Sequence, residues 1–208
     1  MSRTRIKFCG ITRGEDVRCA LELGVDAIGL VLTRKSRRFV EPSSARVLRA
    51  LLPPFVSAVA LLMDDDPEWV EQVIQVVRPD LLQFHGSEDA AFAERLDYPY
   101  LKAVPMASVD DVPAYARAHP RAAGFLLDSH AVGAVGGTGA AFDWTRVPRN
   151  LDRPLVLAGG LDAGNVAAAI TQAQPYAVDV SSGIESEPGI KDPQRMRAFV
   201  AAVRAAGS

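Results

Sequence analysis

The feature that most constrains the fold of this chain is a regular alternation of short apolar runs with longer amphipathic segments from one end to the other. Eight of the runs are rich in leucine or β-branched residues and have the length of buried strands. They cover residues 5–11, 26–32, 57–63, 81–86, 100–106, 124–129, 154–160 and 177–183. Helices are expected at residues 15–24, 43–52, 67–77, 87–96, 109–118, 163–173 and 193–206. Strands that alternate with helices in this way predict a parallel sheet.

Eight strand–helix units in 208 residues predict an α/β protein, a single-domain (β/α)8 TIM barrel that spans residues 1–208. An open doubly wound sheet fits less well, because no Gly-x-Gly-x-x-Gly motif follows the first strand. Residues 143–151, after the sixth strand, carry Pro148 and little amphipathic pattern, so a short or irregular sixth helix is expected there. Ser87 and Asp66 are expected to cap the helices that follow them.

Composition and charge exclude several classes of function. The formal net charge of -2 gives no overall field that would attract nucleic acid or an anionic membrane. No apolar run is long enough to span a bilayer and the chain start lacks a signal peptide's apolar region, so a cytoplasmic protein is expected. Neither the cysteines, which are expected to be free thiols, nor the histidines have the spacing of metal ligands. The basic cluster at residues 33–39 lacks interleaved stacking aromatics, which favours a solvated loop with one inward arginine over an RNA site.

Glycine and serine residues gather where the last two predicted strands end. In a (β/α)8 barrel the carboxyl ends of the strands form the mouth that holds the active site. The two loops contain Gly159, Gly160, Ser181, Ser182 and Gly183. Glycine lets backbone N–H groups approach an oxyanion and serine adds hydroxyl donors, so the two loops together predict a phosphate site. Each loop alone also fits a tight turn out of a strand. Residues 136–139 are a weaker signal of phosphate binding and fit a mobile loop over the site equally well.

Two residues at strand ends are candidates for acid–base chemistry. Asp128 ends the sixth strand, where an apolar neighbourhood would raise its pKa and let it act as a general acid; a helix-side cap is the alternative. Cys9 ends the first strand, and its alternative is a small buried hydrophobe, the interpretation kept for Cys19. Strand alternation places Lys7 on the same side as Cys9, and barrel closure brings Asp179 beside Lys7. Lys7 would favour the thiolate of Cys9, although a buried ion pair that only fills the barrel is also consistent.

Three further polar residues fall near the mouth. Arg38, just beyond the second strand, would clamp a carboxylate through two parallel hydrogen bonds. His85 follows Gln83 on the same face of the fourth strand and is interpreted as a polar contact rather than a base. Lys102 fits a strand lysine that is satisfied by inward carboxylates, with a Schiff-base nucleophile as the alternative.

With these positions in place, the sequence resembles the phosphoribosylanthranilate isomerases along nearly its whole length. The stretches that carry the resemblance are KFCGIT (7–12), GVDAIG (24–29), KSRRF (35–39), LPPFV (52–56), QFHG (83–86), FLLD (125–128), GGTG (136–139) with FDW (142–144), LAGGL (157–161) and VDVSSGIE (178–185). Each stretch is modest evidence by itself, but together and in this order they are highly specific.

The resemblance implies an Amadori rearrangement of N-(5-phosphoribosyl)anthranilate in tryptophan biosynthesis. It implies that Asp128 protonates the furanose ring oxygen, that Cys9 removes the proton from C2, and that Arg38 meets the anthranilate carboxylate. It places the phosphate at residues 159–160 and 181–183. No cofactor is implied, because the substrate's own nitrogen serves as the electron sink. The expected partner is a phosphorylated small molecule, and neither nucleic acid nor a membrane is expected to bind. The barrel is expected to be a monomer or a homodimer.

Two alternatives are retained beside this interpretation. Another ribulose-phosphate-binding barrel enzyme, such as indole-glycerol-phosphate synthase, would need a lysine acid with glutamate partners at the mouth, and Lys102 is its one candidate. A non-catalytic barrel that binds a phosphorylated ligand would need neither Cys9 nor Asp128.

Overall fold

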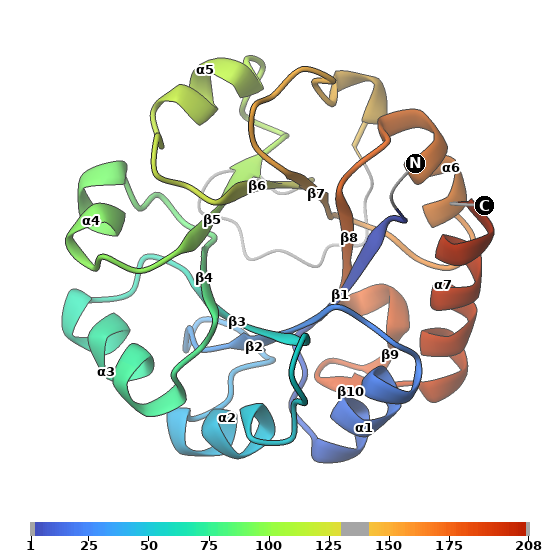
Figure 1. The fold of residues 1–208 in the computed structure, drawn as a ribbon, viewed down its shortest axis with the longest axis horizontal. Coiled ribbons are helices and arrows are strands. Elements are labelled where there is room, and N and C mark those ends of the chain that lie inside the picture. The colour runs from blue at the N-terminus through green and yellow to red at the C-terminus, as the bar shows by residue number, and fades with distance from the viewer. Residues whose placement is uncertain (1–2, 130–141, 207–208) are drawn as a thin grey trace.

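The barrel is built from eight parallel strands that close on themselves in chain order (Figure 1). This computed structural model describes residues 3–129 and 142–206. The strands are β1 (Arg5–Cys9), β2 (Ala27–Val31), β3 (Ser57–Leu62), β4 (Leu81–Phe84), β5 (Tyr100–Pro105), β6 (Gly124–Asp128), β7 (Leu155–Leu157) and β8 (Ala177–Val180). All eight predicted strands are confirmed. Each is shorter than its apolar run, because the last residues of the run leave the sheet for the loops at the mouth.

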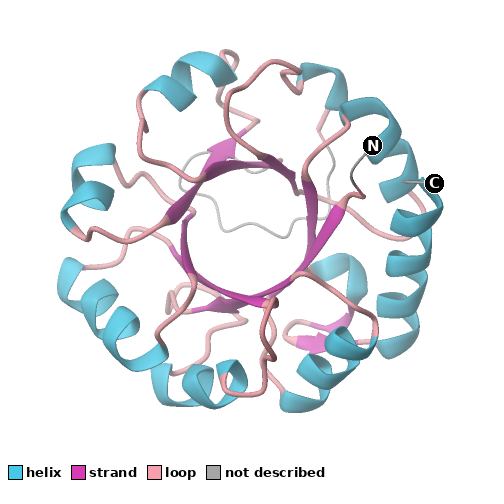
Figure 2. Cartoon of the chain, in the orientation of Figure 1, coloured by secondary structure: helices cyan, strands magenta, loops and turns pink. Residues whose placement is uncertain are grey.

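The helices form a ring around the outside of the barrel (Figure 2). They are α1 (Gly14–Glu22), α2 (Pro42–Arg49), α3 (Pro67–Val77), α4 (Ala90–Arg95), α5 (Val112–Arg117), α6 (Val166–Ala173) and α7 (Pro193–Ala206). Between β6 and β7 the described residues hold only a 3-10 turn, η1 (Trp144–Arg146), in agreement with the short sixth helix expected there. None of the helices in the described part of the chain has the length and apolar character that a membrane crossing requires.

The chain adds a small hairpin between β8 and α7 that the sequence patterns did not predict. A 3-10 turn, η2 (Ser182–Ile184), leads into β9 (Glu185–Glu187), which pairs antiparallel with β10 (Ile190–Lys191). The hairpin lies beside α1 in Figure 1, outside the barrel. The chain segment after the last barrel strand therefore returns to the segment after the first one.

Two apolar layers form because successive side chains of a strand point to opposite faces of the sheet. The larger layer fills the space between the sheet and the helices and includes Phe8, Leu30 and Phe125. The smaller cluster comes from β5 to β8 and contains Leu101, Ala103, Leu126, Val156, Ala158 and Ala177. Buried polar side chains such as Lys7 and Asp179 alternate in sequence with residues of the outer layer, so they occupy the barrel interior.

The helix caps agree only in part with expectation. Asp66 holds the N-cap position of α3 ahead of Pro67, but its side chain makes no capping hydrogen bond. Ser87 is not a cap, because α4 begins later and Asp89 accepts a hydrogen bond from the N–H of Phe92 at 2.7 Å. The Ser87 hydroxyl instead donates to a carboxylate oxygen in the loop after β3, at 2.6 Å. That competing acceptor lies 23 residues away in the sequence, beyond the reach of a local capping pattern.

Replacing Asp89 by Ala is expected to lower the free energy of unfolding by about 1 kcal/mol, because the first turn of α4 loses its side-chain acceptor. Asp66→Ala is the matched control. Asp66 holds the same helix position without a capping bond, so Asp66→Ala is expected to change the free energy of unfolding by no more than about 0.5 kcal/mol. Urea denaturation of both variants measures the two losses, and equal values would contradict the assignment of Asp89 as the cap.

Candidate active site

The carboxyl ends of the strands surround one cavity at the mouth of the barrel. It is lined by Cys9, Val31, Thr33, Ser36, Arg38, Leu61, Met63, Gln83, His85, Asp128, Asp179 and Ser181. Residues from opposite ends of the chain meet here because parallel strands in a barrel all end at the same rim. The cavity therefore brings together the predicted residues Cys9, Arg38, Asp128, Asp179 and Ser181.

Lys7 and Asp179 form an ion pair inside the barrel, next to Cys9. The Nζ of Lys7 lies 2.9 Å from Oδ1 of Asp179, and both side chains are at most 8% exposed. Their contact follows from the register that closes the barrel, in which Lys7 on β1 lies opposite Asp179 on β8. The predicted approach of these two residues is thus observed. Each charge compensates the other in a place where an unpaired charge would be costly.

The thiol of Cys9 is less acidic than the sequence suggested. Burial raises the pKa of Cys9 above its ordinary value, and the charge of Lys7 opposes this rise without reversing it. For Lys7, burial acts to lower the pKa, but Asp179 and the thiol outweigh burial and raise it. The cation is therefore in the predicted place and favours the thiolate as expected, but desolvation of the sulfur outweighs it and leaves the pKa of Cys9 raised.

Gly29 on β2 makes room for the thiol, and it was not singled out from the sequence. A Cβ at this position would lie 2.7 Å from Sγ of Cys9 and 3.2 Å from Cε of Lys7. Register explains the closeness, since Cys9 and Gly29 are partners in the β1–β2 ladder. A glycine inside an apolar strand is itself a signal of close approach by another group, so the sequence held a hint of this contact.

Asp128 is held at the mouth beside His85. The Oδ2 of Asp128 lies 3.4 Å from Nε2 of His85, and both side chains are nearly buried. Nδ1 of His85 lies 3.2 Å from the amide nitrogen of Gln83. With that amide donating to Nδ1, a neutral ring carries its proton on Nε2, facing Asp128. His85 is thus a polar contact of Asp128, consistent with its interpretation from the sequence.

Arg38 reaches the cavity but already holds a carboxylate of the protein. Its Nε and Nη2 donate to the two oxygens of Glu185 at 2.8 and 2.7 Å. Arg38 thus makes a bidentate contact of the predicted kind, but with Glu185 of β9, and the predicted contact with a substrate carboxylate stays a prediction. Among the described residues, Nη1 of Arg38 makes no hydrogen bond. Within the basic cluster Arg38 is the arginine that lines the cavity, whereas Arg34 lies 4.2 Å from the ring centre of Trp69.

The two loops predicted to bind phosphate lie against each other. Gly159 and Gly160 follow β7 with φ angles of 81° and 64°. Ser181 joins the end of β8 to η2, which begins at Ser182. A Cβ on Gly183 would overlap the carbonyl oxygen of Leu161, so the β8 loop can pack on the β7 loop only without a side chain there. Of these residues, Ser181 lines the mouth cavity itself.

Lys102 points away from the mouth. Lys102 lies on the same face of β5 as Tyr100 and Val104, which belong to the apolar layer between the sheet and the helices. The ammonium group lies 2.9 Å from Oε2 of Glu88 and 2.6 Å from the carbonyl oxygen of Gly86. The structure therefore supports a lysine satisfied by a carboxylate, but on the outer face of β5, so the expectation that the carboxylates point inward is wrong. The same position argues against the Schiff-base alternative. Residues 136–139, for which the sequence left two interpretations open, lie outside the described residues.

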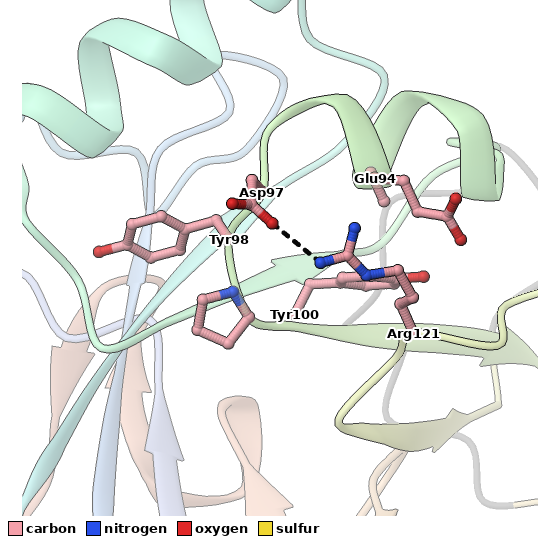
Figure 3. A pocket seen from close by; sticks show the side chains of 7 residues that line it. Glu94, Asp97, Tyr98, Tyr100 and Arg121 are labelled. Carbon is pink, nitrogen blue, oxygen red and sulfur yellow. Dashed lines mark hydrogen bonds and ion pairs between the residues drawn. The ribbon is translucent and has the colours of Figure 1, made fainter.

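A second cleft opens at the other end of the strands, where β5 begins (Figure 3). It is lined by Ala93, Glu94, Asp97, Tyr98, Pro99, Tyr100 and Arg121. Its charged groups are the exposed pair Arg121 and Asp97, 2.8 Å apart, together with Glu94. The cleft holds no thiol, serine or histidine. Nor do residues 3–129 and 142–206 hold a group of three or more His, Cys, Asp or Glu suited to a metal ion. The mouth is therefore the candidate active site.

Comparison with known proteins points to one family. The family model described as N-(5'phosphoribosyl)anthranilate (PRA) isomerase matches residues 6–202. An N-(5'-phosphoribosyl)anthranilate isomerase of Stenotrophomonas maltophilia is 55% identical over 206 residues, covering 98% of this chain and 94% of that protein. The phosphoribosyl anthranilate isomerase from Thermus thermophilus has a TM-score of 0.87 at 35% identity, covering 97% of this chain and 99% of the other. A phosphoribosyl anthranilate isomerase in complex with reduced 1-(o-carboxyphenylamino)-1-deoxyribulose 5-phosphate gives 0.80 at 34% identity, with the same coverage.

Gly29→Ala is expected to lower the free energy of unfolding by about 1–3 kcal/mol, because the added methyl group overpacks the site of Cys9. In a Cys9→Ala background the loss should be smaller, since the closest contact is with Sγ. Gly14→Ala, whose Cβ would meet only ordinary contacts, is the control. Denaturant unfolding of the four variants measures the coupling, and a cost that is unchanged by removing the thiol would contradict the close packing of Cys9 on Gly29.

Proposed function

The chain belongs to the N-(5'-phosphoribosyl)anthranilate isomerase family, and we propose that the mouth residues described above carry out the family's reaction. The protein is an isomerase of tryptophan biosynthesis. It catalyses the Amadori rearrangement of N-(5-phosphoribosyl)anthranilate to 1-(2-carboxyphenylamino)-1-deoxyribulose 5-phosphate. The observation that carries the assignment of roles is the meeting of a thiol, a carboxyl group and an arginine in one cavity.

In the first step, Asp128 is the general acid. Its protonated carboxyl group gives a proton to the furanose ring oxygen, the bond from C1 to that oxygen breaks, and the anthranilate nitrogen forms a C1=N bond. The contact with His85 supports this role, because it fixes one carboxyl oxygen at the wall of the cavity. A general acid that is held in position contributes about 10²- to 10⁴-fold to the rate.

In the second step, the thiolate of Cys9 is the general base. It takes the proton from C2, and the electrons of that bond move toward the nitrogen to give an enolamine. Protonation at C1 and loss of the C2 hydroxyl proton then give the ketone. Burial keeps Cys9 protonated in the resting protein, so its proton must leave before this step. Lys7 is the cation that stabilises the thiolate once it forms.

Binding of the substrate rests on its two anionic ends. Arg38 meets the anthranilate carboxylate through the guanidinium edge that Glu185 leaves accessible to the cavity. The phosphate lies at the loops of Gly159–Gly160 and 181–183, where backbone N–H groups and serine hydroxyls are available. Asp179 lines the cavity between these ends and accepts a hydrogen bond from a sugar hydroxyl. The substrate's own nitrogen is the electron sink in this scheme, which therefore uses no cofactor.

Neither alternative function fits the mouth as well. An indole-glycerol-phosphate synthase would need a lysine acid there, and Lys102 is bound to Glu88 in the outer layer of the barrel. A barrel that only binds a phosphorylated ligand would need neither the thiol of Cys9 nor the carboxyl group of Asp128, and both line this one cavity.

One chain supplies every proposed residue of the site, so a monomer and a homodimer would both carry complete sites. We propose that residues 1–208 act as one domain, because β8 closes the barrel against β1. We also propose a cytoplasmic location, with a phosphorylated small molecule as partner and neither nucleic acid nor membrane. The formal net charge of -2 gives the protein no overall attraction for anions, which favours a local anion-binding site.

Cys9→Ala and Asp128→Asn are each expected to lower kcat for phosphoribosylanthranilate by about 10²- to 10⁴-fold, because each removes a proton-transfer group used in the transition state. The fluorescence of the substrate, followed as the purified protein consumes it, measures the rate. Cys19→Ala, which removes the thiol in α1, is the control and should keep wild-type turnover. Wild-type turnover in the Cys9 or Asp128 variant would overturn that residue's role.

Arg38→Ala is expected to raise KM by about tenfold or more, because a charged hydrogen bond to the substrate carboxylate is lost. The same assay at varied substrate concentration gives KM and kcat separately. Arg34→Ala is the control, since Arg34 belongs to the same basic cluster but stacks on Trp69 outside the cavity. An unchanged KM in the Arg38 variant would remove Arg38 from the binding site.

A further inference from the structure

Lys191 is a buried charged residue that the proposed reaction does not use. Its side chain is 0% exposed. Its Nζ donates to the carbonyl oxygen of Cys9 at 2.6 Å and to Oε1 of Glu185 at 2.8 Å. The carbonyl and hydroxyl oxygens of Ser181 lie 3.2 and 3.4 Å from the same nitrogen. One ammonium group therefore joins the end of β1, the end of β8 and the start of β9.

Glu185 is the carboxylate that Lys191 shares with Arg38. Arg38 takes both oxygens in its bidentate contact, and Lys191 takes Oε1 from another side. The backbone N–H of Gly189 also donates to Oε1, at 3.2 Å. The orientation of Arg38 at the mouth thus depends on a carboxylate whose own position is set by the hairpin of β9 and β10.

The backbone of Lys191 is fixed as well. Its N–H donates to Oδ2 of Asp16 on α1 at 3.3 Å. Arg13, which pairs with Asp16 at 2.7 Å, donates to the carbonyl oxygen of Lys191 at 3.2 Å. The backbone of Lys191 is therefore anchored to the start of α1, while its ammonium group contacts Cys9, Ser181 and Glu185.

We propose that Lys191 is a positioning residue of the active site, which holds Glu185 so that Arg38 faces the substrate carboxylate with a net positive charge behind it. This inference rests on the proposed role of Arg38 in binding that carboxylate. Lys191 does not line the mouth cavity. It therefore acts through Glu185 and Arg38 and makes no contact with the substrate.

The charge balance of the cluster gives the physical reason. Burial acts to raise the pKa of Glu185, but hydrogen bonds from Arg38 and the charge of Lys191 outweigh it and hold that pKa below its ordinary value. The carboxylate is therefore charged. Burial lowers the pKa of Lys191, and the contact with Glu185 opposes that shift and favours the charged ammonium. With Arg38 and Lys191 both charged around one carboxylate, a net positive charge lies beside the mouth. Without Lys191 the pair of Arg38 and Glu185 would be neutral, and its attraction for an anionic substrate would fall.

The test is Lys191→Met, which keeps the length of the side chain and removes the charge. We expect KM for phosphoribosylanthranilate to rise by about tenfold, with a smaller change in kcat. A merely structural role would lower the fraction of active protein, and with it the apparent kcat, but would leave KM unchanged. Lys102→Met is the matched control, because it breaks another buried lysine–glutamate pair, in the outer layer of the barrel. A KM within about twofold of wild type for Lys191→Met, or an equal rise for Lys102→Met, would overturn the proposal.

Glu185→Gln supplies a second test, which asks whether Lys191 acts through Glu185. In the Glu185→Gln variant Lys191 keeps its charge but has no carboxylate to hold, so adding Lys191→Met should raise KM by clearly less than the tenfold expected in the wild-type chain. A further tenfold rise in the double variant would mean that Lys191 works by another route, and would contradict the inference.

Arg38→Ala separates this inference from the proposed function. If Arg38→Ala raises KM and Lys191→Met does not, the positioning role of Lys191 fails while the binding role of Arg38 stands. If Arg38→Ala leaves KM unchanged, the proposed carboxylate site itself fails.

Discussion

The site depends on the closure of the barrel between its first and last strands. Where β8 pairs with β1, Lys7 lies opposite Asp179, and the two charges compensate each other inside the barrel. The same register sets the end of β1, with Cys9, beside the end of β8, with Ser181. A shift of one residue would move every side chain of one strand to the other face of the sheet. Lys7 would then face the apolar layer, without Asp179 beside it.

Much of this arrangement was open to prediction from the sequence because it follows from chain order. Eight strands that alternate with helices have few ways to close, and parallel strands bring all their carboxyl ends to one rim. The positions of Cys9, Asp128 and Ser181 at that rim follow from where their apolar runs stop. The approach of Lys7 to Asp179 follows from closure together with strand alternation. In each case a local pattern and one topological rule are enough.

The remaining contacts could not be predicted, because they depend on side chains that meet across long sequence separations. Glu185 reaches Arg38 from 147 residues away, and Lys191 reaches the carbonyl of Cys9 from 182 residues away. Lys102 shows a different limit. Both faces of a strand in a parallel barrel are buried and apolar, so hydrophobicity alone does not tell which face of β5 points inward. The net effect of Lys7 on Cys9 likewise depends on desolvation of the sulfur, which is a property of the packed site.

Burial and charge act against each other throughout the mouth, and their balance suits the proposed chemistry. Burial raises the pKa of Cys9, so fewer molecules carry the thiolate, but a thiolate with a higher pKa is a stronger base for a carbon-bound proton. Lys7 offsets part of the cost of forming that thiolate, while Asp179 keeps the interior close to neutral. The cluster of Arg38, Glu185 and Lys191 differs in keeping one positive charge. Surface charges are screened beyond about 10 Å at moderate salt, so this local charge, rather than the net charge of the chain, governs the attraction of an anionic substrate to the mouth.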